Sequence, residues 1–300
     1  MTRLDHLDTE RSNPRTARIG AEDSLGIVRL INQEDHLVAA AVEKELPRIA
    51  QAVDAICEKL QSGGRLIYCG AGTSGRLGVL DAAECPPTYG VSPELVRGLI
   101  AGGPPAFLQA VEGAEDNRAM GRADLERIGF SARDVLVGIA ASGRTPYVLG
   151  AMDYARAAGA TVVGLANCGD SELSRHADIC IAPLTGPEAI TGSTRMKSGT
   201  AQKMVLNMLS TASMVRLGKV YGNLMVDMRS TNEKLTERAV SIVRTATGAD
   251  IEKARSALAQ SGYSCKHAIV MILLGVGIDA AREALERANG HISRAVSAQA

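Results

Sequence analysis

Short apolar runs alternate with segments of helical spacing over the first two-thirds of the chain. Each run is of strand length, and the segments between them mostly carry apolar residues one helical turn apart. The runs are Leu66–Cys69, Leu95–Ile100, Val135–Ala140, Thr161–Ala166 and Ile179–Ala182. Strands that alternate with helices favour a parallel sheet with helices on both faces. The pattern predicts an α/β fold built on a five-stranded parallel sheet.

The two ends of the chain differ from this middle part. Residues 1–24 are polar and predict an arm, and residues 25–60 have the apolar spacing of a helix that stops at Gly63-Gly64. A long helix is predicted over Met196–Gly218, and after about residue 231 only Ala-rich helical segments punctuated by glycine follow. We predict an N-terminal arm with helices over 1–54, an α/β domain over 55–230 and a small helical domain over 231–300.

Composition and charge narrow the class of protein. Hydrophobic residues make up 46% of the chain, with no tryptophan, and the net charge is zero from 33 basic and 33 acidic residues. Such a balance provides no basic patch for nucleic acid or an anionic membrane. The first 20 residues hold no apolar signal segment, and the longest apolar run is shorter than the roughly 20 residues of a membrane span. Six cysteines without a Cys-x-x-Cys pair are typical of a reducing compartment, so we expect a cytoplasmic protein.

Two of the predicted strands end in similar loops of small residues, hydroxyls and one arginine. The first loop contains Gly72, Thr73, Ser74 and Arg76, and the second contains Ser142, Gly143, Arg144 and Thr145. Free backbone N–H groups at a helix start attract anions, and glycine lets an anion approach them closely. Hydroxyls and arginine add donors and charge. The pair of loops therefore predicts a site for a small phosphorylated ligand.

Two other interpretations of these loops fit less well. The first loop also matches G-x-G-x-x-G, but a nicotinamide site needs an acidic residue at the end of the second strand. Here that strand ends in Ala101-Gly102-Gly103, and Glu94 lies at its other end. Simple tight turns would explain the glycines, but not the repeated hydroxyls and arginines.

Acidic residues follow both the first loop and the second strand. Glu84 comes ten residues after Ser74, before Cys85-Pro86-Pro87, and Pro86 predicts that the helix breaks there. Glu112, Glu115 and Asp116 follow the second strand. Any one of them could be a solvated helix end, but acid–base chemistry on a sugar needs two carboxyl groups. The five histidines match no metal or catalytic-triad spacing.

A third polar cluster precedes the long helix. It contains Glu188, Ser193, Arg195 and Lys197 within the run GPEAITGSTRMKSGTAQK, which covers residues 186–203. Ser193 and Thr194 could be ordinary helix caps. Alternatively, the cluster forms another helix start that faces an anion.

Taken together, these motifs resemble a sugar-isomerase (SIS) domain and, within that superfamily, the N-acetylmuramic acid 6-phosphate etherases. The run over 186–203 is similar to a signature that these etherases share with the glucokinase regulatory protein. The resemblance extends to VEKELP at 42–47, LDAAECPPTYG at 80–90 and NLMVDM at 223–228. It covers most of the chain and implies an SIS-type sheet with a small helical tail.

The resemblance also implies an activity and its residues. It implies cleavage of the D-lactyl ether of a sugar phosphate, without metal or other cofactor, with Glu84 and Glu115 as the acid–base pair. The residues expected to contact the substrate are Gly72, Thr73, Ser74, Arg76, Ser142, Gly143, Arg144, Thr145, Glu188, Ser193, Arg195 and Lys197. Arg195 or Lys197 is a candidate partner for the lactyl carboxylate. A homodimer is expected from the apolar face of the long helix and from the family.

Two rival functions on the same fold stay open at this point. A sugar-phosphate isomerase would move a proton between C1 and C2 and would release no lactate. A non-enzymatic sensor would bind a sugar phosphate and regulate a partner, and the run over 186–203 by itself does not distinguish it, because the regulatory protein shares that run. The fold alone does not decide between these functions.

Overall fold

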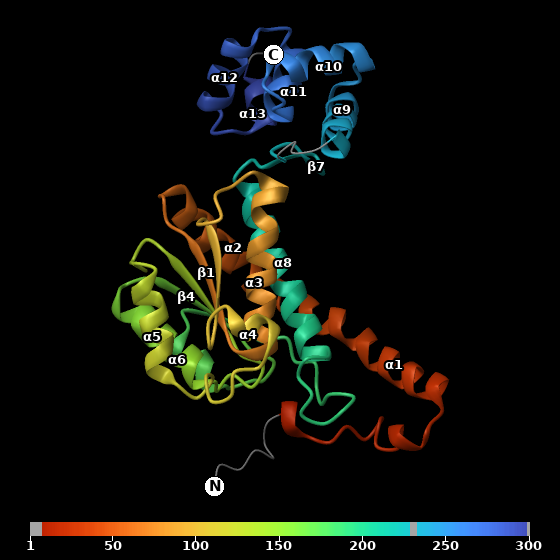
Figure 1. Cartoon of the computed structure of the whole chain (residues 1–300), viewed down its shortest axis with the longest axis vertical. Helices are drawn as coiled ribbons and strands as arrows, with labels where there is room; N and C mark the ends of the chain where they lie inside the picture. Colours follow the sequence, from red (N-terminus) through yellow and green to blue (C-terminus); the bar gives the residue numbers. More distant parts are fainter. Residues whose placement is uncertain (1–7, 229–232, 299–300) are drawn as a thin grey trace. The chain divides into compact units, whose positions relative to one another are not determined.

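The computed structural model describes residues 8–228 and 233–298 (Figure 1). A five-stranded sheet forms its centre, with all strands parallel in the order β2-β1-β3-β4-β5. The strands are β1 (Leu66–Gly70), β2 (Val96–Ile100), β3 (Val135–Ile139), β4 (Thr161–Leu165) and β5 (Ile179–Ile181). Each begins or ends within one residue of a predicted run, so the predicted α/β sheet is confirmed.

Both faces of this sheet are covered by helices, as the continuous apolar runs indicated. On one face, Ile67, Leu136 and Val162 join a core cluster with residues of α6 (Pro146–Ala157). Strand side chains alternate between faces, and Tyr68 on the other face meets Gly78 of α3 (Gly72–Tyr89). Helix α5 (Arg118–Arg127) packs on α6, α7 (Glu172–His176) contacts β4, and the short α4 (Pro105–Leu108) follows β2.

The N-terminal part forms two helices where a single helical stretch was expected. Helix α1 (Ser24–Glu43) begins after Asp23, whose side chain accepts a hydrogen bond from the backbone N–H of Gly26. Helix α2 (Leu46–Gln61) starts a separate helix with Pro47 in its first turn. Proline lacks an N–H and fits a helix start better than a helix interior, which explains the break. The arm before α1 holds two short turns of 3-10 helix, η1 (Asp8–Glu10) and η2 (Ile19–Ala21).

Helix α3 does not break at Pro86, contrary to the prediction. It continues through Pro86 and Pro87 to Tyr89, and Gly90 N–H donates to the carbonyl of Pro86 at 2.9 Å. A proline already has a helical φ, so its cost is the lost donor and crowding of the preceding turn rather than a forbidden conformation. Glu84 therefore lies inside the helix, not at its end.

The chain divides into two compact units. The first comprises residues 1–83 and 94–210, and the second comprises 84–93 and 211–300. The division falls inside α3 and inside α8 (Lys197–Arg216). The described residues 8–54 belong to the first unit. The predicted boundary at 230/231 lies outside the described residues.

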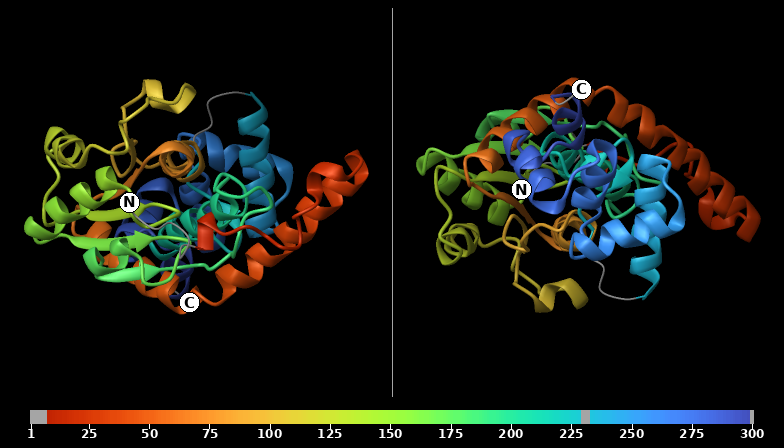
Figure 2. Two further views of the ribbon diagram at one scale, coloured as in Figure 1. Left: turned by 90° about the horizontal axis from the view of Figure 1, so that it is seen from below. Right: turned by 90° about the horizontal axis from the view of Figure 1, so that it is seen from above.

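The second unit is mainly helical, as expected (Figure 2). Helix α11 (Cys265–Leu274) contacts α9 (Glu233–Thr247), α10 (Ile251–Gln260), α12 (Ile278–Arg287) and α13 (Ile292–Ser297). Val243, Leu258 and Ile269 are fully buried in its core. A small antiparallel pair, β6 (Val220–Tyr221) and β7 (Leu224–Met225), was not predicted, because two-residue strands leave no periodic signal.

The described residues contain no helix long and apolar enough to cross a membrane. In the same part of the chain, no group of three His, Cys, Asp or Glu side chains could hold a metal ion. All six cysteines are free, and all but Cys180 are buried. The buried ones pack as small hydrophobic side chains.

Candidate functional site

The two hydroxyl-bearing loops lie beside each other at one edge of the sheet. Strands β1 and β3 are neighbours, and Gly70 at the end of β1 pairs with Ile139 at the end of β3. Helix α3 begins one residue after β1, and α6 begins at Pro146 after a six-residue loop, so both helix starts lie at the same edge. Pro146 has no N–H, and the N–H of Tyr147 donates to the carbonyl of Glu115, so the free N–H groups at this edge come mainly from the start of α3. The predicted pairing of the two loops is confirmed, and this edge can attract an anion.

Close packing at the first loop requires glycine at two positions. A Cβ atom on Gly70 would lie 2.6 Å from the nitrogen of Gly75, and one on Gly75 would lie 2.6 Å from the carbonyl oxygen of Gly70. Gly72 is different, because it is exposed and has a φ of +51° with open space around it. The backbone at the start of α3 is therefore open to a ligand.

Ser74 makes a hydrogen bond within the protein. Its side chain is buried and donates to Oε1 of Gln202 at 2.8 Å, and Nε2 of Gln202 donates to Oδ1 of Asn167 at 3.0 Å. This chain of bonds joins the ends of β1 and β4 to α8. Sequence reasoning missed Asn167, although it follows a strand just as Ser74 does and the same rule would have found it.

The second loop keeps its polar side chains available. Ser142, Arg144 and Thr145 are half-buried, and none has a side-chain hydrogen bond to the described residues. Gly143 has a φ of +62°, and a Cβ atom there would lie 2.4 Å from Cβ of Ser171. The glycine thus lets the loop turn tightly while its hydroxyls stay accessible.

Ser142→Ala is expected to weaken binding of N-acetylglucosamine 6-phosphate. A hydrogen bond to a charged phosphate contributes about 1.5–3 kcal/mol, so the dissociation constant should rise about 10- to 150-fold. Ser142 is a cleaner test than Ser74, because the hydroxyl of Ser74 also holds Gln202. Isothermal titration calorimetry would measure the dissociation constant. The control is Ser62→Ala, at the exposed end of α2. Equal affinity in Ser142→Ala and wild type would show that Ser142 does not contact the phosphate.

A pocket of about 180 Å³ lies in the first unit beside the first loop. Gly72, Arg76, Glu112 and Glu115 line it, together with small apolar residues. Nε of Arg76 donates to the carbonyl of Phe107 at 2.9 Å, which orients the guanidinium. The structure therefore brings three predicted site residues together, Gly72, Arg76 and Glu115.

Glu115 is held by its backbone while its side chain stays exposed. Its carbonyl oxygen accepts a hydrogen bond from the N–H of Tyr147 at 3.0 Å, in the first turn of α6. Tyr147 is itself fully buried and donates to Oδ2 of Asp124 at 2.7 Å. The backbone of a buried core residue thus fixes the backbone of Glu115 beside the pocket, while the Glu115 side chain stays exposed there.

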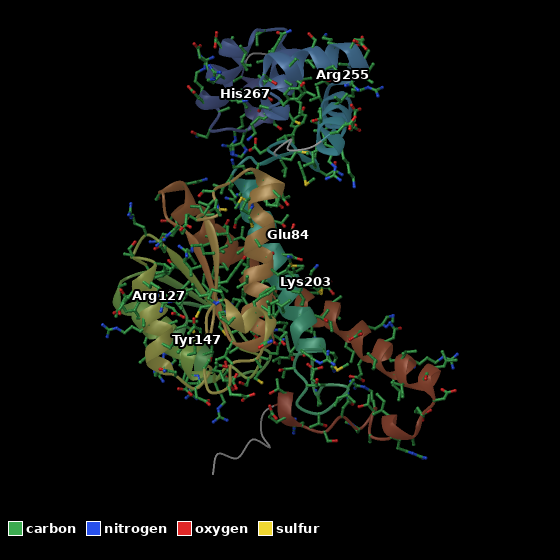
Figure 3. The ribbon with its side chains drawn as sticks, viewed as in Figure 1. Glu84, Arg127, Tyr147, Lys203, Arg255 and His267 are labelled. Atoms are coloured by element: carbon green, nitrogen blue, oxygen red, sulfur yellow. The ribbon has the colours of Figure 1, made fainter. Side chains whose placement is uncertain are left out.

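Glu84 lines a different pocket, in the second unit. This pocket of about 410 Å³ is lined by Glu84, Pro86, Pro87, Thr88, Met225, Met228, Leu235 and Arg238. The side chain of Glu84, labelled in Figure 3, is exposed on α3. Each predicted acid–base residue therefore lies in a pocket of its own unit.

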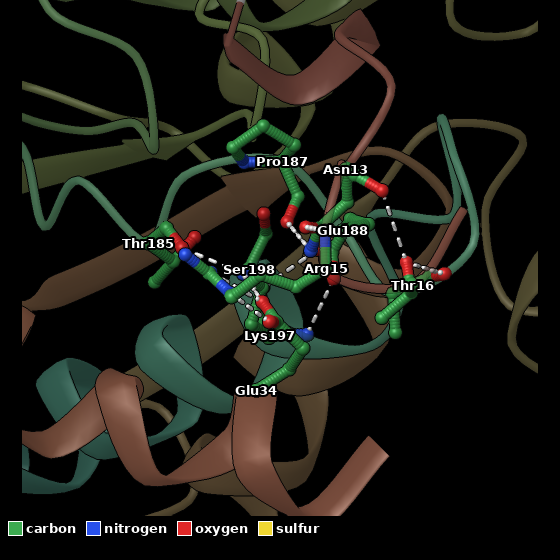
Figure 4. Close-up of polar contacts among 10 residues, drawn as sticks. Asn13, Arg15, Thr16, Glu34, Thr185, Pro187, Glu188, Lys197 and Ser198 are labelled. Carbon is green, nitrogen blue, oxygen red and sulfur yellow. Dashed lines mark hydrogen bonds and ion pairs between the residues drawn. The ribbon is translucent and has the colours of Figure 1, made fainter. Parts of the chain in front are cut away.

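The sequence predicted that the start of α8 faces an anion. In the structure, a carboxylate of the protein itself occupies this position. The fully buried carboxylate of Glu188 accepts hydrogen bonds from the backbone N–H groups of Lys197 and Ser198, both at 2.9 Å (Figure 4). A carboxylate at this position satisfies free donors and the positive end of the helix dipole. The expected role of Glu188 in contacting substrate is thus replaced by helix capping.

The side chain of Lys197 is likewise bonded to other groups of the protein. It is fully buried, and Nζ donates to Oε2 of Glu34 at 2.7 Å and to the carbonyl of Thr185 at 2.8 Å (Figure 4). Glu34 also binds Arg15. The Arg15 hydrogen bonds, helped by Lys197 and opposed by burial, lower the pKa of Glu34 to about 2. Lys197 is therefore no partner for a lactyl carboxylate, whereas Arg195 is exposed and Ser193 half-buried.

The N-terminal arm holds the backbone of the same run. Nδ2 of Asn13 donates to the carbonyl of Pro187 at 3.2 Å, and the hydroxyl of Thr16 donates to the carbonyl of Ala189 at 2.8 Å (Figure 4). Both side chains are buried. The arm thus fixes the loop before α8, a role that its polar composition did not reveal.

Comparison with protein families agrees with this geometry. The N-terminal SIS domain of the glucokinase regulatory protein matches residues 48–156, the SIS domain matches 128–212, and the C-terminal lid domain of the glucokinase regulatory protein matches 222–272. The fold and the loops thus define an SIS-domain protein with a helical lid.

Comparison with individual relatives identifies the family more narrowly than the domain matches do. An N-acetylmuramic acid 6-phosphate etherase of Photorhabdus laumondii is 56% identical over 295 residues, covering 98% of each chain. One of Aeromonas hydrophila is 58% identical over 291 residues, covering 97% of this chain and 98% of its own. The chain belongs to the N-acetylmuramic acid 6-phosphate etherase family. A solved phosphoheptose isomerase from Francisella tularensis is 19% identical over 65% of this chain and all of its own, with a TM-score of 0.47.

Proposed function

We propose that the chain cleaves the D-lactyl ether of N-acetylmuramate 6-phosphate, giving N-acetylglucosamine 6-phosphate and D-lactate. The observation that carries this proposal is the near-full-length identity to etherases, at 55–58% over almost the whole chain. The paired loops support a phosphorylated ligand, and the pockets at Glu84 and Glu115 support acid–base chemistry. Such an enzyme is a carbon–oxygen lyase that serves amino-sugar recycling.

The reaction is an elimination followed by addition of water. In the open-chain sugar, the aldehyde at C1 makes the proton on C2 weakly acidic. A base removes that proton, the C3–O bond breaks, and its electron pair stays on the lactyl oxygen, which takes a proton from an acid. Water then adds across the C2–C3 double bond. The elimination needs one ionised and one protonated carboxyl group.

We assign Glu115 as the base and Glu84 as the acid. Glu115 lines a polar pocket near the sheet edge, where the sugar phosphate would bind, and its exposed carboxylate can take the C2 proton. Glu84 lines a pocket with more apolar walls, which suits the leaving lactyl group. Thr73, Ser142, Thr145 and the N–H groups at the start of α3 would bind the phosphate.

Incubation with N-acetylmuramate 6-phosphate and an enzymatic assay for D-lactate test this function directly. Stoichiometric lactate and N-acetylglucosamine 6-phosphate are expected. An isomerase would rearrange a sugar phosphate without releasing lactate, and a sensor would bind the sugar phosphate without turnover. Either result would overturn the proposed activity.

We also propose that the protein is a homodimer. Leu25 and Val28 are large hydrophobic side chains about one helical turn apart on α1, and they are 53% and 56% exposed. Exposed apolar side chains on one helix are typical of an interface. Sedimentation velocity should show a dimer, and Leu25→Asp/Val28→Asp should shift it toward monomer. A wild-type chain that sediments only as a monomer at micromolar concentration would contradict the proposal.

A further inference from the structure

The pocket at Glu84 contains one acid, one cation and an apolar wall. The lining residues that the structure describes all belong to the second unit. Its polar members are Glu84, Thr88 and Arg238, and its thioether and aliphatic members are Met225, Met228 and Leu235. Met228 is buried, whereas Met225 and Leu235 are half-buried. The pocket thus offers contacts of three different kinds within a small volume.

The charge of Arg238 is not neutralised by the described part of the chain. Arg238 is exposed on α9 and forms no ion pair with any described residue, Glu84 included. Its neighbour Glu237 is already paired with Arg255, at 2.8 Å. An arginine without a carboxylate partner that lines a pocket is suited to bind a carboxylate of a ligand.

The lactyl group has the matching chemistry. One carbon atom of this group carries a carboxylate, a methyl group and the ether oxygen that must be protonated. A cation, an apolar wall and a carboxyl acid are the groups that would recognise these three features. The pocket holds all three as Arg238, the Met225–Met228–Leu235 wall and Glu84.

We propose that Arg238 binds the lactyl carboxylate and so selects substrates that carry this acid. The proposal rests on the proposed function and adds a specificity-determining residue to it. It replaces Lys197 in this role, because Lys197 is fully buried and bound to Glu34 and Thr185. In this role Arg238 takes no part in proton transfer, and the proton passes from Glu84 to the departing oxygen.

The test compares Arg238→Met with Arg238→Lys and with Arg244→Met. Methionine keeps much of the apolar stem and removes the charge. Arg244 is a matched control, because it is an exposed arginine on the same helix that does not line the pocket. Loss of a charged hydrogen bond predicts a fall of about 10- to 150-fold in kcat/KM for lactate release in Arg238→Met. Arg238→Lys should recover part of that loss, and Arg244→Met should match wild type.

Two further measurements separate this role from a structural one. N-acetylglucosamine 6-phosphate has no lactyl group, so its C2 deuteration should be as fast in Arg238→Met as in wild type. A substrate whose lactyl carboxylate is converted to an amide should react more slowly with wild type, by a similar factor. Arg238→Met should no longer distinguish the amide from the acid. A merely structural defect would slow deuteration and would preserve the preference for the acid.

The outcomes also separate this inference from the proposed function. If wild type releases no lactate, the proposed function itself fails. If wild type releases lactate and Arg238→Met does so at the wild-type rate, only the role of Arg238 is overturned. The role is likewise overturned if Arg238→Met loses lactate release and C2 deuteration to the same extent.

Discussion

Glu115→Gln is expected to lose both lactate release and exchange of the C2 proton, by about 10²–10⁴-fold in each. Both processes begin with removal of the C2 proton, and glutamine cannot accept it. Glu84→Gln should lose lactate release by a similar factor but should still exchange the C2 proton of N-acetylglucosamine 6-phosphate with deuterated solvent. That exchange needs the base alone and no leaving-group acid. A coupled lactate assay and proton NMR on the same samples would measure both quantities.

The matched control is Asp116→Asn. Asp116 follows Glu115 directly and is exposed, but it does not line the pocket, so the variant should behave like wild type. Loss of deuteration in Glu84→Gln with its retention in Glu115→Gln would reverse the two roles. Full activity in both variants would mean that neither glutamate takes part, and both would be ordinary solvated side chains of their elements.

Glu34→Gln is expected to destabilise the first unit by about 3–5 kcal/mol at neutral pH. The side chain of Glu34 is only 2% exposed, and its ion-pair partner Lys197 is fully buried. Removing the negative charge leaves the Lys197 ammonium buried without a counter-ion, and such a change typically has this cost. Urea unfolding followed by circular dichroism would measure the difference in free energy of unfolding.

The same pair predicts how this difference depends on pH. Arg15 and Lys197 hold the folded-state pKa of Glu34 at about 2, below the ordinary value of 4.5. The folded state therefore favours the ionised carboxylate, and this contribution to stability is fully present above about pH 4.5. It should decline as the pH falls from 4.5 toward 2, so wild type and Glu34→Gln should converge in that window. A difference that stays constant over this window would contradict the assignment.

Two variants serve as controls for the buried pair. Glu126→Gln breaks an exposed pair with Arg122 on α5 and should change stability by less than about 1 kcal/mol. The double variant Glu34→Gln/Lys197→Met removes both charges, so it should lose less stability than the sum of the single variants. If Glu34→Gln lowers the free energy of unfolding no more than Glu126→Gln does, the Glu34–Lys197 pair does not stabilise the fold.

The sheet and its two hydroxyl-bearing loops were predictable from the sequence because their signals are local. A buried parallel strand is a short apolar run, and the loop that follows it is marked by glycine and hydroxyl residues within a few positions. Parallel strands place such loops at one edge of the sheet, whereas the strand order β2-β1-β3-β4-β5 makes the loops after β1 and β3 neighbours. Glu84 and Glu115 were indicated by resemblance, because a carboxylate at a given spacing has no local signal of its role.

The local rules for proline and for apolar spacing predicted the wrong helix boundaries at two places. Pro86 predicted a helix end at Glu84, yet α3 continues to Tyr89, because a proline is disfavoured in a helix rather than excluded from it. Conversely, Pro47 divides a stretch whose apolar spacing predicted one helix. Each of these effects amounts to a few kcal/mol, which tertiary contacts can exceed or reinforce.

By itself, the sequence determined the strands, the two loops and, through its motifs, the family. Only the tertiary structure decided which polar groups are available to a ligand. Glu34 and Lys197 are 163 positions apart, and Ser74 and Gln202 are 128 apart, so no periodicity or spacing could pair them. The sequence made Lys197 a candidate ligand group, whereas the fold buries it against Glu34 and places Arg238 in the Glu84 pocket instead. Charges are solvated or neutralised by their neighbours in space, and the fold alone decides which neighbours those are.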